Sequence, residues 1–325
     1  MTTITTGAPA NHTSNAELHG ILLMVAGMSL APLMDGIAKY LSEFISPVEV
    51  SLGRFACQAL IVLVIAFFMR RSFGSLLKEM DRIQFIRGAC LAICSIFFFT
   101  SLKYMPLADA IAIFFVQPMI LTVLSAVVLK EKVGVRRWAA VVVGMVGALI
   151  IIRPGSSALG LPSLLPLAAA TCFAIYLVLT RKLSGKASLL GIQFATGVAG
   201  VLTLIPLVVI SSLLGIEAAA WTTPELSHLP LFLLMGIISF TSHGFIVLAF
   251  DRLPASVLAP LGYTEIISAT IVGYVLFGDI PDKFVWLGVA LIAGGGLYIA
   301  HRERTAAKRQ AESEELVDSS PTRHC

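Results

Sequence analysis

Ten runs of apolar residues, each roughly 20 residues long, dominate the sequence and limit what the chain can fold into. A helix of about 20 residues crosses the ~30 Å hydrocarbon core of a bilayer. The composition agrees, because 57% of the residues are hydrophobic and only 13% are charged. The sequence lacks the alternating pattern of an outer-membrane barrel. It therefore predicts an all-α integral membrane protein.

The apolar runs predict ten membrane spans joined by short connections. The predicted spans are residues 18–38, 48–69, 83–102, 106–128, 135–152, 161–180, 188–213, 229–250, 254–277 and 282–300. Pro106 and Pro254 each follow a very short connection, where a proline suits the first turn of the next helix.

Lysine and arginine are distributed unequally over the two sides that these spans define. Of the 23 Lys and Arg residues, 18 fall on the side of the N-terminus, 4 fall on the other side, and Arg54 lies inside a span. The positive-inside rule then places both termini in the cytoplasm. Residues 1–17 carry no Lys or Arg and no cleavable signal. Residues 301–325 are charged and polar, which predicts a disordered cytoplasmic tail.

The chain contains an internal repeat. An offset of 148 residues aligns, without a gap, Gly88 with Gly236, Phe97 with Phe245, Pro106 with Pro254, Glu131 with Asp279, Trp138 with Trp286 and Gly147 with Gly295. Because each copy has five spans, an odd number, the second copy must enter the membrane from the opposite side. The sequence therefore predicts ten transmembrane helices arranged as two inverted five-helix repeats, residues 18–152 and 161–300. This arrangement favours alternating access to a site near the midplane.

The same regions resemble a known family. The stretch SLKYMPLADAIAIFFVQPMILTVLSAVVLKEKVGVRRWAAVVVGMVGALIIIRPG (residues 101–155) and its counterpart FDRLPASVLAPLGYTEIISATIVGYVLFGDIPDKFVWLGVALIAGGGLYI (residues 250–299) resemble the five-helix repeat of the drug/metabolite transporter superfamily, EamA-domain branch. The resemblance implies a multi-pass secondary carrier in the bacterial inner membrane, with ten helices around a central cavity. Members of the family export amino acids and drugs or import riboflavin or S-adenosylmethionine.

Ionisable residues inside spans need a partner or a role, because they are costly to insert. Glu265 lies halfway along the ninth span, and the repeat places Gln117 at the same depth in the fourth. Pro260 and Pro118 lie nearby and free backbone carbonyls where helices line cavities. Glu265 is expected to bind a cationic substrate group or to carry a coupling proton. The alternative is a protonated acid hydrogen-bonded to a neighbouring helix.

Asp35 and Lys39 lie one helical turn apart near the end of the first span, and Arg54 lies about two turns into the second span from the same side. One interpretation is a structural ion pair between Asp35 and Arg54, with Lys39 directed outward. The other is that Arg54 meets an anionic or carbonyl group of the substrate.

Further polar residues within the spans complete the candidate substrate-binding or coupling site. His243 either carries a proton or packs with a hydrogen bond. Tyr176 and Tyr263, with Gln58 and Gln193, either orient or stack on a planar ligand or simply pack between helices.

Residues near the span ends have structural interpretations. Glu131 and Asp279 are expected to cap helices or to pair with Lys132 and Lys283. Tryptophans are expected as interfacial anchors, and several glycines as surfaces for close helix packing, namely Gly144, Gly147, Gly294, Gly295 and Gly296.

Function classes other than transport find little support. The sequence has no GxxxxGK[ST] motif, no metal-type spacing of Cys or His, no clustered catalytic residues and no sign of a nucleic-acid partner. We therefore expect a non-enzymatic carrier without a cofactor, whose partners are the lipid bilayer, a small-molecule substrate and a coupling proton. The function that we favour from the sequence is uptake of riboflavin or a similar planar metabolite. The alternatives are export of amino acids or drugs, S-adenosylmethionine uptake, and a membrane-embedded enzyme. The oligomeric state stays open.

Overall fold

A computed structural model of the chain describes residues 10–128, 135–152, 160–183, 187–215, 221–253, 261–262, 264–295 and 298. Helices and turns make up these residues, and no strand occurs among them. The helices are α1 (Ala10–Leu41), α2 (Pro47–Phe68), α3 (Phe73–Lys78), α4 (Arg82–Ser101), α5 (Leu107–Phe114), α6 (Gln117–Val128), α7 (Val135–Ile152), α8 (Leu164–Leu183), α9 (Leu189–Leu213), α10 (Leu229–Phe250), α12 (Thr264–Phe277) and a further helix, Lys283–Gly295. Single turns of 3₁₀ helix, Leu161–Ser163 and Leu226–His228, precede α8 and α10.

The predicted all-α membrane fold is confirmed. Within the described residues, six helices are long and apolar enough to cross a membrane, and four shorter apolar helices accompany them. These segments follow the predicted spans closely, and α7 and α10 match theirs residue for residue. Because the apolar parts of these four helices are only 10–17 residues long in the described part, the count of ten spans stays a prediction.

The predicted fourth span, 106–128, was wrong as a single helix. The chain forms a turn at Phe115 and Val116, which separates α5 from α6. Pro118 has no amide hydrogen to donate to the carbonyl of Phe114, so the helical ladder is interrupted there. The Met119 amide instead bonds to the Val116 carbonyl at 3.0 Å. The break leaves Gln117 as the first residue of α6.

The helices begin at side chains that satisfy their free amide groups. Ser46 and Glu49 form a capping box at the start of α2, in which the Glu49 amide donates to Ser46 Oγ at 3.3 Å and the Ser46 amide donates to Glu49 Oε2 at 3.1 Å. Asp81 caps α4, and Asp282 caps the helix Lys283–Gly295. These caps explain why the predicted starts of these three helices, at residues 48, 83 and 282, each lie within one residue of the observed start, whereas α1 begins eight residues before its predicted start.

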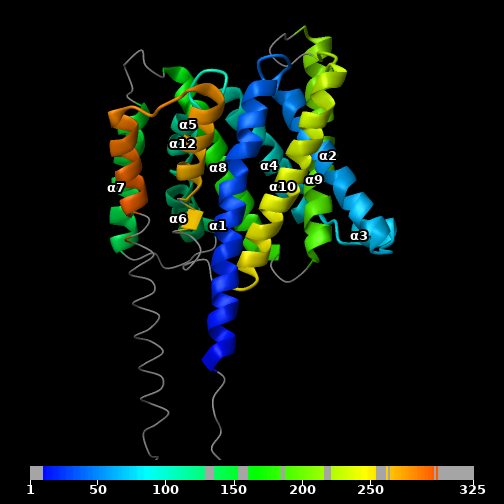
Figure 1. Cartoon of the computed structure of the whole chain (residues 1–325), viewed down its shortest axis with the longest axis horizontal. Coiled ribbons are helices and arrows are strands. Elements are labelled where there is room, and N and C mark those ends of the chain that lie inside the picture. The colour runs from blue at the N-terminus through cyan, green and yellow to red at the C-terminus, as the bar shows by residue number, and fades with distance from the viewer. Residues whose placement is uncertain are drawn as a thin grey trace, which may run out of the picture.

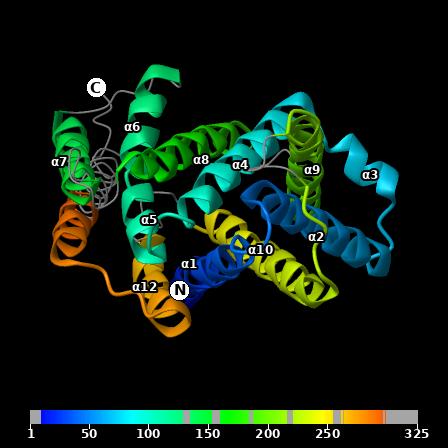
Figure 2. The ribbon, with the colours of Figure 1, turned by 90° about the horizontal axis from the view of Figure 1, so that it is seen from above.

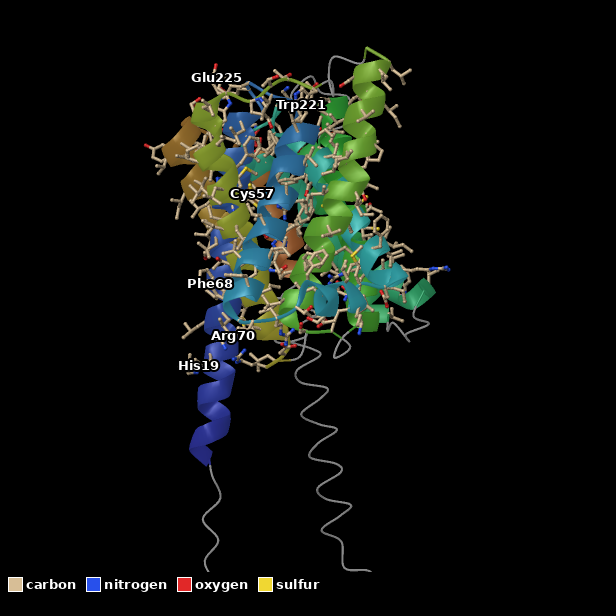
Figure 3. The ribbon with its side chains drawn as sticks, turned by 90° about the vertical axis from the view of Figure 1, so that its right-hand side faces the viewer. His19, Cys57, Phe68, Arg70, Trp221 and Glu225 are labelled. Atoms are coloured by element: carbon tan, nitrogen blue, oxygen red, sulfur yellow. The ribbon has the colours of Figure 1, made fainter. Side chains whose placement is uncertain are left out.

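The two ends of the helical bundle can be told apart by the residues that lie there. His19, Phe68 and Arg70 lie at one end, and Trp221 and Glu225 lie at the opposite end (Figure 3). We call these the N-terminal end and the far end. The helix Lys283–Gly295 also runs toward the N-terminal end (Figure 1).

The helix contacts occur in matching sets. α4 packs against α8 and α9, whereas α10 packs against α1 and α2, and α2 and α9 pack against each other (Figure 2). The sequence repeat makes α8, α9 and α10 the counterparts of α1, α2 and α4. Each contact in the first set therefore has its equivalent in the second, as expected when two similar units pack about a pseudo-two-fold axis.

Glycines permit close approaches between these helices. A Cβ added to Gly88 in α4 would lie 2.6 Å from the Cβ of Ala199 in α9, and one added to Gly236 in α10 would lie 2.6 Å from the Cβ of Cys57 in α2. Gly88 and Gly236 are the pair that the 148-residue offset aligns. The repeat in the sequence thus appears as a repeated contact in the structure.

The packing expected of other glycines is confirmed in part. A Cβ added to Gly147 would lie 2.8 Å from the carbonyl oxygen of Gly288, and Gly144 packs against Met119. The expectation for Gly294 was wrong, because no atom of the described residues lies within 4 Å of an added Cβ there. Gly296 lies outside the described residues.

Candidate functional site

A chain of buried polar groups crosses the interior of the apolar bundle, and Arg54 on α2 is its centre. Arg54 is 3% exposed. Its Nη1 donates to Ser95 Oγ on α4 at 2.6 Å, and its Nε donates to Ser239 Oγ on α10 at 3.2 Å. Two neighbouring helices therefore hold the guanidinium through neutral hydroxyl groups, and no acidic group of these helices neutralises its charge within 4 Å.

Two glutamines extend this chain to α9. Ser239 Oγ donates to Gln58 Oε1 at 3.1 Å, and Gln58 Nε2 donates to Gln193 Oε1 at 3.2 Å. Gln193 Nε2 then donates to the carbonyl of Phe240 at 3.0 Å. Both glutamines are almost fully buried. Because each amide fixes the next one, the network holds Arg54 in one orientation.

His243 lies one turn along α10 from Ser239. Its Nδ1 is 2.9 Å from the Ser239 carbonyl oxygen, which can only accept, so Nδ1 carries the proton and Nε2 is left to bind or exchange one. The half-buried ring is within electrostatic range of both Arg54 and Arg87. Its position agrees with either predicted role.

Asp35 on α1 and Glu265 in the first turn of α12 are two carboxyl groups within electrostatic range of each other. Asp35 is 5% exposed, and Glu265 is half-buried. In the part of the chain that the structure describes, neither carboxylate accepts a hydrogen bond, and neither has a cation within 4 Å. Buried carboxylates normally have such partners, so these two have unused capacity for a cation or a proton.

The expected direct ion pair between Asp35 and Arg54 does not form within the described residues, although the two are within electrostatic range. Lys39 does not point outward as expected. Its Nζ lies 2.6 Å from Asp279 Oδ2 and 4.3 Å from the centre of the Phe277 ring. Asp279, expected to cap a helix or pair with Lys283, pairs with Lys39 because α1 packs against α12.

The remaining predicted residues are less central or differently placed. Gln117 is half-buried at the break between α5 and α6, and no hydrogen bond or ion pair of the described residues joins it to the charged groups. Tyr176 on α8 is 6% exposed. Its ring stacks on Phe173, with 5.4 Å between centroids, and the Arg87 guanidinium lies 5.3 Å from its centre. Protein groups thus already occupy this stacking surface. Tyr263 and Glu131 lie outside the described residues.

Sequence reasoning missed three contributors to the polar interior, namely Ser95, Ser239 and Arg87. The two serines carried a weak signal as small polar residues within apolar spans, where they bond across helices. Arg87 fell inside the predicted span 83–102 and was still counted with the loop charges. The structure shows it fully buried.

Comparison with known proteins adds independent information. The model of the EamA-like transporter family matches residues 18–153 and again residues 161–300. The chain is 23% identical to the S-adenosylmethionine uptake transporter of Rickettsia prowazekii, covering 94% of the chain and 100% of the relative. It is 28% identical to the riboflavin transporter of Vibrio cholerae, covering 90% and 96%. It is 24% identical to the pseudopaline exporter CntI of Pseudomonas aeruginosa, covering 84% and 93%.

A solved structure titled "Crystal structure of protein" has the same fold. It superposes with a TM-score of 0.59 at 18% identity, over 89% of this chain and 98% of the other.

Proposed function

Because this chain belongs to the EamA-like transporter family, we propose that it is a secondary carrier that takes up a small, positively charged metabolite across the bacterial inner membrane. Residues 18–152 and 161–300 form the two inverted repeats, and rocking between them exposes the polar interior to each side in turn. The N-terminal end is cytoplasmic. The two separate family matches and the paired helix contacts support this assignment.

The observation that carries the proposal is the pair of carboxyl groups of Asp35 and Glu265, which have no hydrogen-bonding or ion-pair partner among the residues that the structure describes. They lie on α1 and α12, in different halves of the sequence repeat, and are within electrostatic range of each other. Two acidic groups that have no cation of the described residues within 4 Å form a site that a cationic substrate group or a coupling proton can complete. Arg54, held by serine hydroxyls, then meets an anionic or carbonyl group of the same substrate.

S-adenosylmethionine is the test substrate that fits this charge pattern, since it carries a sulfonium, an ammonium and a carboxylate. The Rickettsia relative is named for its uptake. Riboflavin is the second candidate, favoured by the Vibrio relative and by the amide groups of Gln58 and Gln193. Export, as in the Pseudomonas relative, is the opposite direction of the same mechanism.

Uptake of radiolabelled S-adenosylmethionine and of riboflavin by cells expressing the chain tests the proposal. We expect S-adenosylmethionine to accumulate, and Glu265→Gln and Asp35→Asn each to reduce its uptake at least about tenfold. Glu225→Gln, at an exposed carboxylate of the far end, is the matched control and should leave uptake unchanged. Accumulation of riboflavin alone would favour the second candidate. Uptake that is unaltered by both variants would remove the carboxyl pair from the mechanism.

Proton coupling is tested in proteoliposomes with an imposed pH gradient. We expect the gradient to stimulate uptake by the natural chain and to have no effect on residual uptake by Glu265→Gln. Equal stimulation of both proteins would show that the coupling proton binds elsewhere.

A further inference from the structure

Arg87 is a second buried arginine, separate from the Asp35 and Glu265 pair. It lies in the first two turns of α4, near the N-terminal end, and it is 0% exposed. Its Nη2 donates to the carbonyl of Ile192 at 3.1 Å and to Thr196 Oγ1 at 2.9 Å, both on α9. With the Tyr176 ring of α8 against its guanidinium, three helices fix its position.

The hydrogen bonding of this guanidinium is incomplete. Its Nε and Nη1 are buried and have no acceptor in the described part of the chain. No carboxylate of the described residues lies within 4 Å of it either. An arginine that only joins helices would be expected to use these donors, because a buried charge without acceptors is destabilising. The unused donors therefore indicate an acceptor that comes from outside the protein.

The surroundings of Arg87 connect it with the central network. Arg54 lies in the first half of α2, nearer the far end, whereas Arg87 lies nearer the N-terminal end. His243 is within electrostatic range of both. The bundle thus holds two fixed positive charges at different depths, each bound by hydroxyl or carbonyl groups rather than by an acidic side chain.

We propose that Arg87 is an oxyanion-binding position, which takes the carboxylate of the transported molecule as that molecule moves toward the N-terminal end. The substrate part of this inference rests on the proposed function. The anion-binding part does not, since a free oxyanion offers the same acceptor atoms.

Anion binding is tested on the purified full chain by measuring Tm as acetate replaces chloride at constant ionic strength. We expect acetate to raise Tm by about 2 °C or more in the natural protein and to have no effect in Arg87→Gln. Arg252→Gln removes an equal charge from an exposed site at the same end and should keep the response. An equal acetate response in Arg87→Gln would overturn the proposal.

A second variant keeps the test decisive if Arg87→Gln fails to fold. Thr196→Val removes the hydroxyl that orients Nη2 but keeps the charge, and we expect it to weaken the acetate response. An unchanged response in Thr196→Val, together with an unfolded Arg87→Gln, would mean that Arg87 serves only to hold the helices.

The source of the anion is tested by transport. We expect the natural chain to take up S-adenosylmethionine at least about tenfold better than its decarboxylated analogue, and Arg87→Gln to lose this preference. A preference that survives in Arg87→Gln, with the acetate response lost, would assign the site to a free anion. If the natural chain transports neither compound, the proposed function fails, while the acetate measurement still tests the anion site.

Discussion

At the scale of single residues, Arg54 has the most defined environment of the ionisable groups. It bonds to Ser95 and Ser239 on two different helices and has no carboxylate within 4 Å among the described residues. A guanidinium suits this geometry because its donors diverge in one plane, whereas an ammonium is a point charge on a flexible stem.

We therefore predict that Arg54→Lys reduces substrate uptake at least about tenfold although the positive charge remains. The lysine can reach only one of the two serines at a time. Uptake assays at matched expression measure this, and Arg252→Lys, at an exposed site, provides the control. Full activity of Arg54→Lys would show that charge alone is needed.

Four of these ionisable residues were named from the sequence, and their role in a site stays a prediction. Asp35, Arg54, His243 and Glu265 are conspicuous because an ionisable group inside an apolar span requires a role. In the structure, each of these four residues is within electrostatic range of at least one of the other three. The partners were not predictable, because Arg54 bonds to a serine 185 residues away and Lys39 pairs with a residue 240 away. Such contacts depend on how whole helices pack.

At the scale of the helical elements, the start of α9 depends on a carboxylate from a distant connection. Glu79, which follows α3, accepts from the Ser188 amide at 2.8 Å and from Ser188 Oγ at 2.9 Å. Arg71 donates to the same serine hydroxyl at 2.9 Å. The N-terminus of α9 is thus tied to the connection between α2 and α4.

We predict that Glu79→Ala lowers the free energy of unfolding by about 1–2 kcal/mol, because it leaves the amide and hydroxyl of Ser188, the N-cap of α9, without this acceptor. Thermal or denaturant unfolding in detergent measures the change. The exposed Glu43, replaced by Ala, is the matched control and should be neutral. Equal stability of the Glu79 and Glu43 variants would contradict this role.

The elements themselves were largely predictable, because each apolar run ends at a polar cap or a short turn. The short helix α3 was not predicted, since six residues are too few to show a period. The position of the break in the fourth span was not predicted either. Pro118 signalled a distortion but did not determine which residues would form the turn.

At the scale of the whole molecule, the repeated glycine contacts offer a direct test of the two-fold arrangement. We predict that Gly88→Leu and Gly236→Leu destabilise the protein to a similar extent, each by about 1–3 kcal/mol, because both force apart closely packed helices. Gly294→Leu should be close to neutral, as an added Cβ has no neighbour within 4 Å in the described residues. The unfolding midpoints of the three variants measure these effects. A large destabilisation by only one of Gly88→Leu and Gly236→Leu would contradict the equivalence of the two glycine contacts.

The ion pair of Lys39 with Asp279 connects the two halves near the far end. Its side chains are only 14% and 23% exposed, so it is screened less than a surface pair. We predict a favourable coupling energy of about 1 kcal/mol in a double-mutant cycle with Lys39→Ala and Asp279→Ala. Additive effects of the two changes would show that the pair contributes nothing.

The all-α membrane fold and the equivalence of helices in the two copies were predictable, because they follow from the apolar runs and the sequence repeat. The predicted odd number of spans per copy would impose an inverted arrangement, and the residue alignment pairs α4 with α10 as equivalent helices, which make matching contacts. The contacts of α4 with α8 and of α10 with α1 could not be predicted from the repeat, because several other helices could have packed in those positions.

The placement of Arg54 also has an electrical consequence. Arg54 and Arg87 each contribute a fixed positive charge, so in the proposed mechanism the number of protons on Asp35 and Glu265 sets how the net charge of the interior changes. Charge displaced through the bilayer field costs about 2.3 kcal/mol per elementary charge at 100 mV. The number of protons moved in one transport cycle should therefore be measurable as an electric current. Membrane voltage should change the rate of the step of the cycle in which that charge crosses the bilayer.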